Sequence, residues 1–262
     1  PTFAPMDEFW APRRYIQAAL EAALDKPVIH MGVGVQLPRA RPLRRRDFGI
    51  AEDRYAFLFF FDYTSYASRK NPEAVLEAFH RAFPPGSPAP VTLVLKSMGL
   101  ELESGRRQHL AELAAQDPRI RLIDRALEPG EQAALLASVD ALVSLHRSEG
   151  FGLGMAEALL LGKPVVATAY GGCMDFLAPD NACLVDYRLA PGGPRPDPPG
   201  EGQVWADPGL DQAAHYLRRL VAEPAWGQAL AARGQQEVRT NHSPAAIGRR
   251  AAERLRGLGL IA

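Results

Sequence analysis

The stretch "DALVSLHRSEGFGLGMAEALLLGKPVVAT", residues 140–168, decides the fold class of this 262-residue chain. Its first part, "DALVSLH", is an apolar run that predicts a strand. "LGMAEALLLG" then predicts a helix packed on a sheet, and "PVVAT" predicts a second strand. A strand, a helix and a strand in this order are typical of a parallel sheet whose strands are buried on both faces.

The same alternation extends outward from this stretch over residues 51–184. Four more apolar runs predict strands, namely "YAFLFFFD" (55–62), "VTLVLK" (91–96), "RIRLID" (119–124) and "ACLVD" (182–186). Helical patterns separate them, among them "NPEAVLEAFHRAF", in which Asn71 suits the N-cap and Pro72 the first helical position. Six strands with intervening helices predict a Rossmann-like α/β fold, a parallel sheet flanked by helices.

The two ends of the chain are expected to lie outside this pattern. Residues 1–24 predict a terminal helix from a linker or from an N-terminal domain missing here, and "KPVIHMGV" predicts a strand after it. The Rossmann-like domain is expected over 25–240, with a helix at 241–262 that crosses back to the missing domain. Prolines and glycines at 190–208 predict an extended surface loop. The chain begins without a methionine, and we expect a longer protein.

Composition excludes several classes of protein. Lys plus Arg equals 30 and Asp plus Glu equals 30, so the net charge is zero, which argues against a nucleic-acid-binding domain. No apolar run approaches the roughly 20 residues of a transmembrane helix, and the N-terminal residues lack the order of a signal peptide. Cys173 and Cys183 give neither a disulfide framework nor a metal cluster. We expect a cytoplasmic protein, with the basic run at 39–46 a solvated linker or a contact with anionic lipid at the inner face of the membrane.

Candidate chemistry is expected in the loops that follow the strands, because helix N-termini there present free N–H groups. The loop "RSEGFGLG" contains Glu149, and Gly150 and Gly152 permit unusual torsions and a close backbone approach. The amides of Phe151, Gly152 and Leu153 then suit an anion such as a diphosphate. The alternative is a tight turn with Glu149 at a helix start. The spacing GxGxG differs from the GxGxxG of dinucleotide sites.

Two further features favour a nucleotide. Glu157 lies in an apolar helix, where a carboxylate needs a partner, either ribose hydroxyls or a basic side chain. Arg69 and Lys70 precede the helix at 71–83, where the dipole disfavours cations unless an anion is bound. The alternative for this pair is a solvated basic turn.

Weaker candidates are expected on the same edge of the sheet. Lys96 ends its strand there and adds positive potential. His146 is either a pocket wall or, slightly favoured, a hydrogen-bonded core histidine. Asp175, with the amides of Gly171 and Gly172, either approaches a ligand or caps a short helix.

The segment "HRSEGFGLGMAEALLLGKPVVAT", followed by "GG", resembles the donor-site signature of retaining family 4 glycosyltransferases with the GT-B fold. Its core is two glutamates separated by seven residues, here Glu149 and Glu157. "FDYTSYASRKNPEAVLEAF" (61–79) resembles the phosphate-binding loop of a bacterial branch of that family. The resemblance extends from about Asp7 to the end of the chain.

This resemblance implies the donor-binding half of a retaining hexosyltransferase, inactive as this piece alone and without a metal or other cofactor. Lys70 and Glu149 would have catalytic roles, one neutralising the diphosphate and the other contacting the sugar, while Glu157 would contact the ribose. The segment from Arg125 to Leu127 would receive the base. The implied donor-binding residues are Arg69, Lys70, Lys96, Arg125, Leu127, Glu149, Gly150, Phe151, Gly152, Leu153 and Glu157.

The resemblance also implies the partners: a GDP- or UDP-linked sugar, and a glycan or lipid-linked glycan acceptor bound by an N-terminal domain, in polysaccharide biosynthesis. Many relatives carry a Gly-Arg pair about six residues before the lysine, whereas this chain has "DYTS" (62–65), so Arg69 or Lys96 would replace that arginine. The alternatives are a non-catalytic nucleotide-binding module and another GT-B enzyme such as a sugar phosphorylase.

Overall fold

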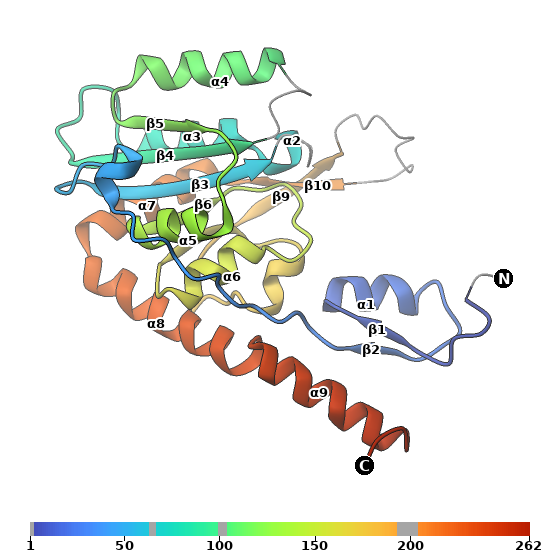
Figure 1. Ribbon diagram of the computed structural model, residues 1–262. Coiled ribbons are helices and arrows are strands. Elements are labelled where there is room, and N and C mark those ends of the chain that lie inside the picture. Colours follow the sequence, from blue (N-terminus) through green and yellow to red (C-terminus); the bar gives the residue numbers. More distant parts are fainter. Residues whose placement is uncertain (1–2, 63–66, 99–103, 193–203) are drawn as a thin grey trace.

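A computed structural model of the chain describes residues 3–62, 67–98, 104–192 and 204–262 (Figure 1). Its centre is a parallel sheet of six strands in the order β5-β4-β3-β6-β7-β8. The strands are β3 (Tyr55–Asp62), β4 (Val91–Met98), β5 (Ile120–Asp124), β6 (Ala141–Ser144), β7 (Val165–Thr168) and β8 (Cys183–Val185). They correspond to the six predicted strands, so the prediction of a Rossmann-like α/β fold is confirmed.

Helices cover both faces of this sheet. In β3 the side chains of Phe57, Phe59 and Phe61 pack with α3 and α7 on one face, whereas Ala56 and Leu58 pack with α5 and α6 on the other. Each fully buried side chain of this size contributes about 1.5–3 kcal/mol to folding. The helices around the sheet are α2 (Ala67–Lys70), α3 (Pro72–Ala82), α4 (Ser104–Gln116), α5 (Pro129–Ser138), α6 (Leu153–Leu160), α7 (Leu210–Ala222) and α8 (Pro224–Asn241).

The strand order reverses between β3 and β6. From β3 the chain proceeds outward through β4 and β5, then returns to β6 beside β3 and continues to β7 and β8. A crevice at the carboxyl ends of the strands is typical of such a reversal, and ligands of open α/β sheets bind there. The loop after β3 leads to Arg69 and Lys70, and the loop after β6 contains Glu149. The fold therefore places both predicted loops at the reversal.

The N-terminal residues form a small βαβ unit of their own, which contains β1 (Phe9–Ala11), α1 (Arg14–Glu21) and β2 (Val28–His30). The helix was predicted, but β1 was not, because three residues carry too little pattern to distinguish a strand from a loop. The predicted strand at 26–33 pairs with β1 and does not join the six-stranded sheet. That residues 1–24 belong to a linker or to another domain stays a prediction.

The proline-rich stretch at 190–208 corrects one expectation. Its two ends lie in an antiparallel pair of strands, β9 (Tyr187–Pro191) and β10 (Val204–Pro208), rather than in an extended loop. Pro191 and Pro208 each end a strand of this two-stranded sheet, in which both strands are edge strands, and edge strands tolerate proline. Residues 193–203 lie outside the described part of the chain.

The chain ends in three helices, α7, α8 and α9 (Pro244–Gly257), and the last of them corresponds to the helix predicted at 241–262. Helix α9 extends away from the sheet and along the N-terminal βαβ unit, as Figure 1 shows. The Arg254 guanidinium binds the Glu8 carboxylate, and the Arg250 Nη1 lies 3.4 Å from the Met31 carbonyl oxygen. Within the described ranges, every helix is too short or too polar to cross a bilayer.

Candidate functional site

Lys70 and Glu149 meet at the reversal point of the sheet. The Lys70 Nζ donates to Glu149 Oε2 at 2.5 Å, and the Arg69 Nη1 lies 3.8 Å from the same oxygen. The Arg69 Nη1 also donates to the Ser148 carbonyl at 2.6 Å. The two loops, 79 residues apart in the sequence, therefore form one cluster of two cations and one carboxylate.

The electrostatics of this cluster keep Glu149 ionised. Burial acts to raise its pKa, but the charge and hydrogen bond of Lys70, with smaller effects of His146 and Arg69, leave the pKa of Glu149 below its ordinary value. A carboxylate that remains ionised at neutral pH also offsets one of the two positive charges. Lys70 and Arg69 together therefore retain positive character toward the crevice.

Asn71 and Arg147 fix the position of Lys70. Asn71 has a left-handed backbone with φ of 61°, and its side-chain amide donates to the Leu145 carbonyl at 3.0 Å. It occupies the predicted N-cap position of α3, yet forms no side-chain cap. Arg147 donates from Nη1 to the Ser68 carbonyl at 3.0 Å and from its backbone N–H to the Arg69 carbonyl at 2.8 Å. Arg147 was not predicted as a site residue, because its partners are 79 and 78 residues away.

The glycines of the loop after β6 are required by packing. Gly152 has φ of 85° at the N-cap of α6, a region that favours glycine. A Cβ at Gly154 would lie 2.0 Å from the Phe60 ring. A Cβ at Gly172 would lie 1.7 Å from the Gly150 carbonyl oxygen, and the Gly172 N–H donates to the Glu149 carbonyl at 2.9 Å. The loops after β6 and β7 are therefore interlocked.

The contacts of the Gly171–Asp175 segment bear on the two interpretations of Asp175. The Gly172 amide is occupied by Glu149, as described above. The Asp175 carboxylate accepts from the Arg14 backbone N–H at 3.1 Å and lies 3.3 Å from His30 Nε2. Asp175 thus holds the N-terminal βαβ unit. The predicted cap of the short helix does not form, since Gly171 is the N-cap of the 3₁₀ helix Gly172–Asp175 and no side-chain hydrogen bond caps it, while an approach to a ligand stays a prediction.

Two cavities lie along α6, and one of them borders the cluster. The first, of about 220 Å³, is lined by Lys70, Glu149, Gly152 and Leu153 among others. The second, of about 390 Å³, is lined by Glu157 and by residues from three further segments. Those residues are Gln36, Leu37, Pro38, Leu127, Pro129, Gln132, Ala133 and Leu136. Glu157 and Leu127, both predicted donor-binding residues, thus lie on one cavity.

Glu157 forms no ion pair with any residue in the described part of the chain, which disfavours a basic side chain as its partner. Burial raises its pKa to about 7. Glu157 lines a cavity with apolar walls and two amide side chains, Gln36 and Gln132. An uncharged hydrogen-bond donor from a ligand is a suitable partner for it.

Other predicted site residues lie apart from these cavities. Lys96 is buried in β4, where its Nζ donates to the Ser97 carbonyl at 3.1 Å and burial lowers its pKa. Arg125 is exposed and lies 3.4 Å from Glu131. Phe151 is buried against Phe176, with ring centroids 5.1 Å apart. Neither Lys96 nor Arg125 is among the residues that line the two cavities.

His146 is a core histidine, the slightly favoured alternative. It is fully buried, with Nε2 2.9 Å from the Tyr170 carbonyl oxygen and Nδ1 2.9 Å from Ser144 Oγ. Burial lowers its pKa despite these contacts. A neutral imidazole here ties the loop after β7 to the strand that leads to Glu149.

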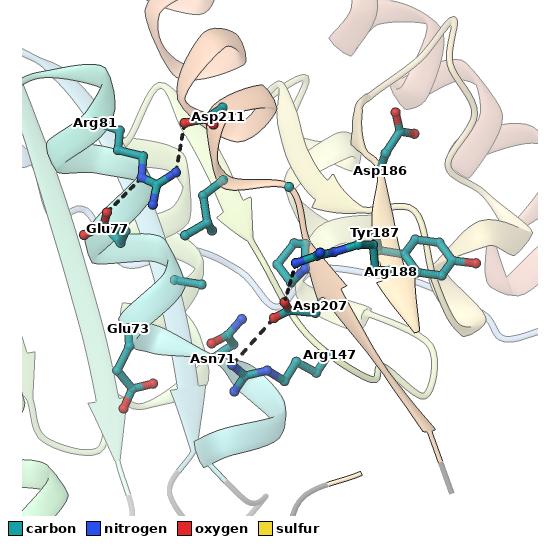
Figure 2. A pocket seen from close by; sticks show the side chains of 14 residues that line it. Asn71, Glu73, Glu77, Arg81, Arg147, Asp186, Tyr187, Arg188, Asp207 and Asp211 are labelled. Atoms are coloured by element: carbon teal, nitrogen blue, oxygen red, sulfur yellow. Dashed lines mark hydrogen bonds and ion pairs between the residues drawn. The ribbon is translucent and has the colours of Figure 1, made fainter. Parts of the chain in front are cut away.

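A third cavity, of about 640 Å³, lies between α3, α7 and the β9–β10 pair (Figure 2). Its walls are charged: Arg81 contacts Glu77 and Asp211, while the Asp207 carboxylate lies 3.9 Å from both Arg147 and Arg188. This hollow was not predicted. Arg147 lines this cavity and also donates to the Ser68 and Arg69 carbonyls, next to Lys70. The β9–β10 pair therefore contacts the cluster through Arg147.

No group of three His, Cys, Asp or Glu side chains suitable for a metal ion occurs in the ranges that the structure describes. The expectation that the chain works without a metal stays a prediction. The region of the usual Gly-Arg pair, residues 62–65, is described only at Asp62.

Comparison with known proteins supplies a family. The sequence model of "Glycosyl transferases group 1" matches residues 58–191. A "D-inositol 3-phosphate glycosyltransferase" of Nocardioides is 29% identical over 231 residues, covering 81% of this chain and 44% of the relative. The chain spans 26% and 44% of the length of two curated relatives.

Solved structures agree on the fold. Anabaena Alr3699/HepE in complex with UDP and glucose superimposes with a TM-score of 0.71 at 20% identity, covering 96% of this chain and 63% of that one. The C-terminal domain of a Francisella tularensis glycosyl transferase group 1 family protein gives a TM-score of 0.60 at 19% identity. That match covers 81% of this chain and 100% of that one.

Proposed function

Since this chain belongs to the glycosyl transferase group 1 family, we propose that it is the donor-binding half of a retaining hexosyltransferase that uses a nucleotide-diphosphate sugar. The observation that carries the proposal is the Lys70–Glu149 pair at the reversal of the sheet, next to a glycine loop at the start of α6. A cation and free amides at one point suit a diphosphate, and an ionised carboxylate beside them suits sugar hydroxyls.

Each of these residues would then have its own role in the reaction. Departure of a nucleoside diphosphate develops negative charge, which Lys70, Arg69 and the amides of residues 151–153 would stabilise from fixed positions. Glu149 would orient the transferred sugar, and Glu157 would accept hydrogen bonds from the ribose. We assign the base to the cavity lined by Leu127. No step assigned to these side chains requires a metal.

The donor and acceptor follow by analogy. The Anabaena relative binds UDP and glucose, so a UDP-linked hexose is the first choice of donor and a GDP-linked one the second. The acceptor, a glycan or lipid-linked glycan in polysaccharide biosynthesis, would bind to a domain outside this chain. Turnover would then need that domain, and this chain alone would bind donor without transferring sugar. The expected location is the cytoplasm, or the inner face of its membrane.

Calorimetry of this chain with UDP, GDP and ADP tests the proposal. We expect one nucleotide to bind, with Glu157→Ala weakening it about tenfold or more, as loss of hydrogen bonds to a charged group implies. In the full-length protein, Glu149→Ala should mainly lower turnover. Absence of binding by all three nucleotides would contradict the proposal. Binding without turnover in the full-length protein would favour a non-catalytic module instead.

A further inference from the structure

Arg13 occupies a helix position, the N-cap, at which arginine is not a preferred residue. It is the N-cap of α1, where Ser, Thr, Asp or Asn would stabilise the helix, and its side chain forms no cap hydrogen bond. Asp175 instead accepts from the Arg14 backbone N–H at 3.1 Å. Helix stability therefore does not explain an arginine at this position.

The side chain of Arg13 lies on the glycine loop next to Glu149. Its guanidinium carbon is 5.8 Å from the centroid of the Phe151 ring. A Cβ at Gly150 would lie 3.1 Å from Arg13 Nη1, and one at Gly172 would lie 2.9 Å from Arg13 Cδ. Both glycines thus leave space for this side chain, which borders the residue directly after Glu149.

Arg13 also differs from the neighbouring cations in its partners. Arg69 and Lys70 both face the Glu149 carboxylate. In the part of the chain that the structure describes, the Arg13 side chain forms neither a hydrogen bond nor an ion pair, and its Nε is buried without a partner. A half-buried guanidinium without a counter-charge is unfavourable, and its planar fork matches a carboxylate or a phosphate.

We propose that Arg13 binds an anionic group, a carboxylate or a phosphate, carried by one of the two sugars in the transfer reaction. The proposal rests on the proposed function, which assigns the diphosphate to Lys70. Lys70 and Arg69 approach the loop at the Glu149 carboxylate and the Ser148 carbonyl, whereas Arg13 approaches at Gly150 from the N-terminal βαβ unit. An anion beside Arg13 therefore belongs to the ligand beyond the diphosphate, either to the donor sugar or to the acceptor sugar.

Two ligand pairs, measured by calorimetry on the full-length protein because the acceptor is expected to bind to a domain outside this chain, distinguish these sources. The donor pair is UDP-glucose and UDP-glucuronate, and the acceptor pair is glucose and glucose 6-phosphate in the presence of saturating UDP. We expect the anionic member of one pair to bind about 10- to 100-fold more tightly, the range for hydrogen bonds to charged groups. Arg13→Gln should abolish this preference and leave the affinity for UDP alone unchanged, while Arg13→Lys should retain part of it.

Arg46→Gln is the matched control, because Arg46 is an exposed arginine of the 3₁₀ helix Arg45–Phe48, at the opposite end of the sheet strands. It removes the same charge and should leave the affinities for both ligand pairs unchanged.

Equal affinities within both pairs, or a preference that survives in Arg13→Gln, would overturn the inference. A loss of UDP affinity in Arg13→Gln as large as the loss of the preference would overturn it too. If GDP binds in place of UDP, GDP-mannose and GDP-mannuronate form the donor pair and GDP saturates the acceptor pair. Failure of every nucleotide to bind would instead reject the proposed function itself.

Discussion

Glu157 is a single residue whose environment predicts a pH dependence of donor binding. Its pKa is raised to about 7 by burial, so it ionises between pH 6 and pH 8. An ionised carboxylate accepts hydrogen bonds from hydroxyls more strongly than a neutral one. We expect UDP affinity to rise about tenfold from pH 6 to pH 8, because the ionised fraction rises by about that factor. Calorimetry at three pH values should show this rise for the native chain and not for Glu157→Gln.

The same residue predicts a pH dependence of stability with the opposite sign. Its pKa lies near 7 in the folded chain against an ordinary value of 4.5, so folding favours the protonated form. Its contribution therefore decreases as pH rises from about 4.5 to 7 and stays constant above that window. The free energy of unfolding in urea should fall less between pH 5 and pH 8 in Glu157→Gln than in the native chain. Parallel pH profiles would contradict the burial argument.

Lys70 and Glu149 should be coupled in stability as well as in function. Lys70→Met leaves the buried Glu149 carboxylate with Arg69, at 3.8 Å, as its cationic neighbour and with the Gly150 N–H at 3.0 Å. Removing one member of a buried ion pair costs about 3–5 kcal/mol, and we expect the lower end here because Arg69 remains. Adding Glu149→Gln should recover part of this loss, since the buried charge is gone. Urea unfolding of the two single variants and the double variant measures the coupling, and purely additive losses would argue against it.

At the scale of elements, the interlocked loops after β6 and β7 make Gly172 the most sensitive glycine of the site. A Cβ there would lie 1.7 Å from the Gly150 carbonyl oxygen, so the loop that carries Glu149 has to shift. We expect Gly172→Ala to weaken UDP binding more than tenfold, because a misplacement of about 1 Å at such a site has effects of that size or larger. Calorimetry on the purified variant checks this.

Gly248 provides the matched control for that substitution. It lies in α9, and a Cβ there meets no atom within 4 Å. Gly248→Ala should therefore stabilise the chain by about 0.5–1 kcal/mol through its higher helix propensity, without changing UDP affinity. Equal losses of UDP affinity in both alanine variants would mean that the loop contact is not the cause.

The elements also show which features could be predicted. The six strands of the sheet were predictable because each is a short run rich in apolar, β-forming residues between helical patterns. Strand β1 has three residues, and β9 and β10 flank a proline-rich segment, so the sequence pattern was not sufficient to predict any of these three strands. The meeting of Lys70 with Glu149 was predictable from the common edge of parallel strands.

The partners of individual side chains were harder to predict from the sequence. The Asn71 amide binds a carbonyl 74 residues away, and nothing local in the sequence indicates that partner. Lys96 was expected to add charge at the edge, but its side chain is buried with a lowered pKa. Sequence patterns therefore predicted which elements meet, whereas the orientation of each side chain required the packed structure.

For the whole molecule, α9 holds the N-terminal βαβ unit against the sheet domain. Arg254 binds Glu8, and Arg250 approaches the Met31 carbonyl, so both contacts join the two ends of the chain. The unit has a second attachment at Asp175, and its own strands are only three residues long. We therefore expect its stability to depend on α9, whereas the six-stranded sheet has its own core.

Truncation after Ser243 removes α9 and tests this dependence by hydrogen exchange. Backbone amides of β1 and β2 should lose most of their protection, because two of the attachments are gone and a two-stranded sheet is marginal alone. Amides of β3, β4 and β6 should retain theirs. Arg256→Gln is the matched control, since the Arg256 side chain donates to the carbonyl of Ala262, beyond the end of α9, and not to the N-terminal unit as far as the structure describes it. Unchanged exchange in β1 and β2 would mean that Asp175 is a sufficient attachment. Loss across the whole sheet would mean that α9 belongs to its core.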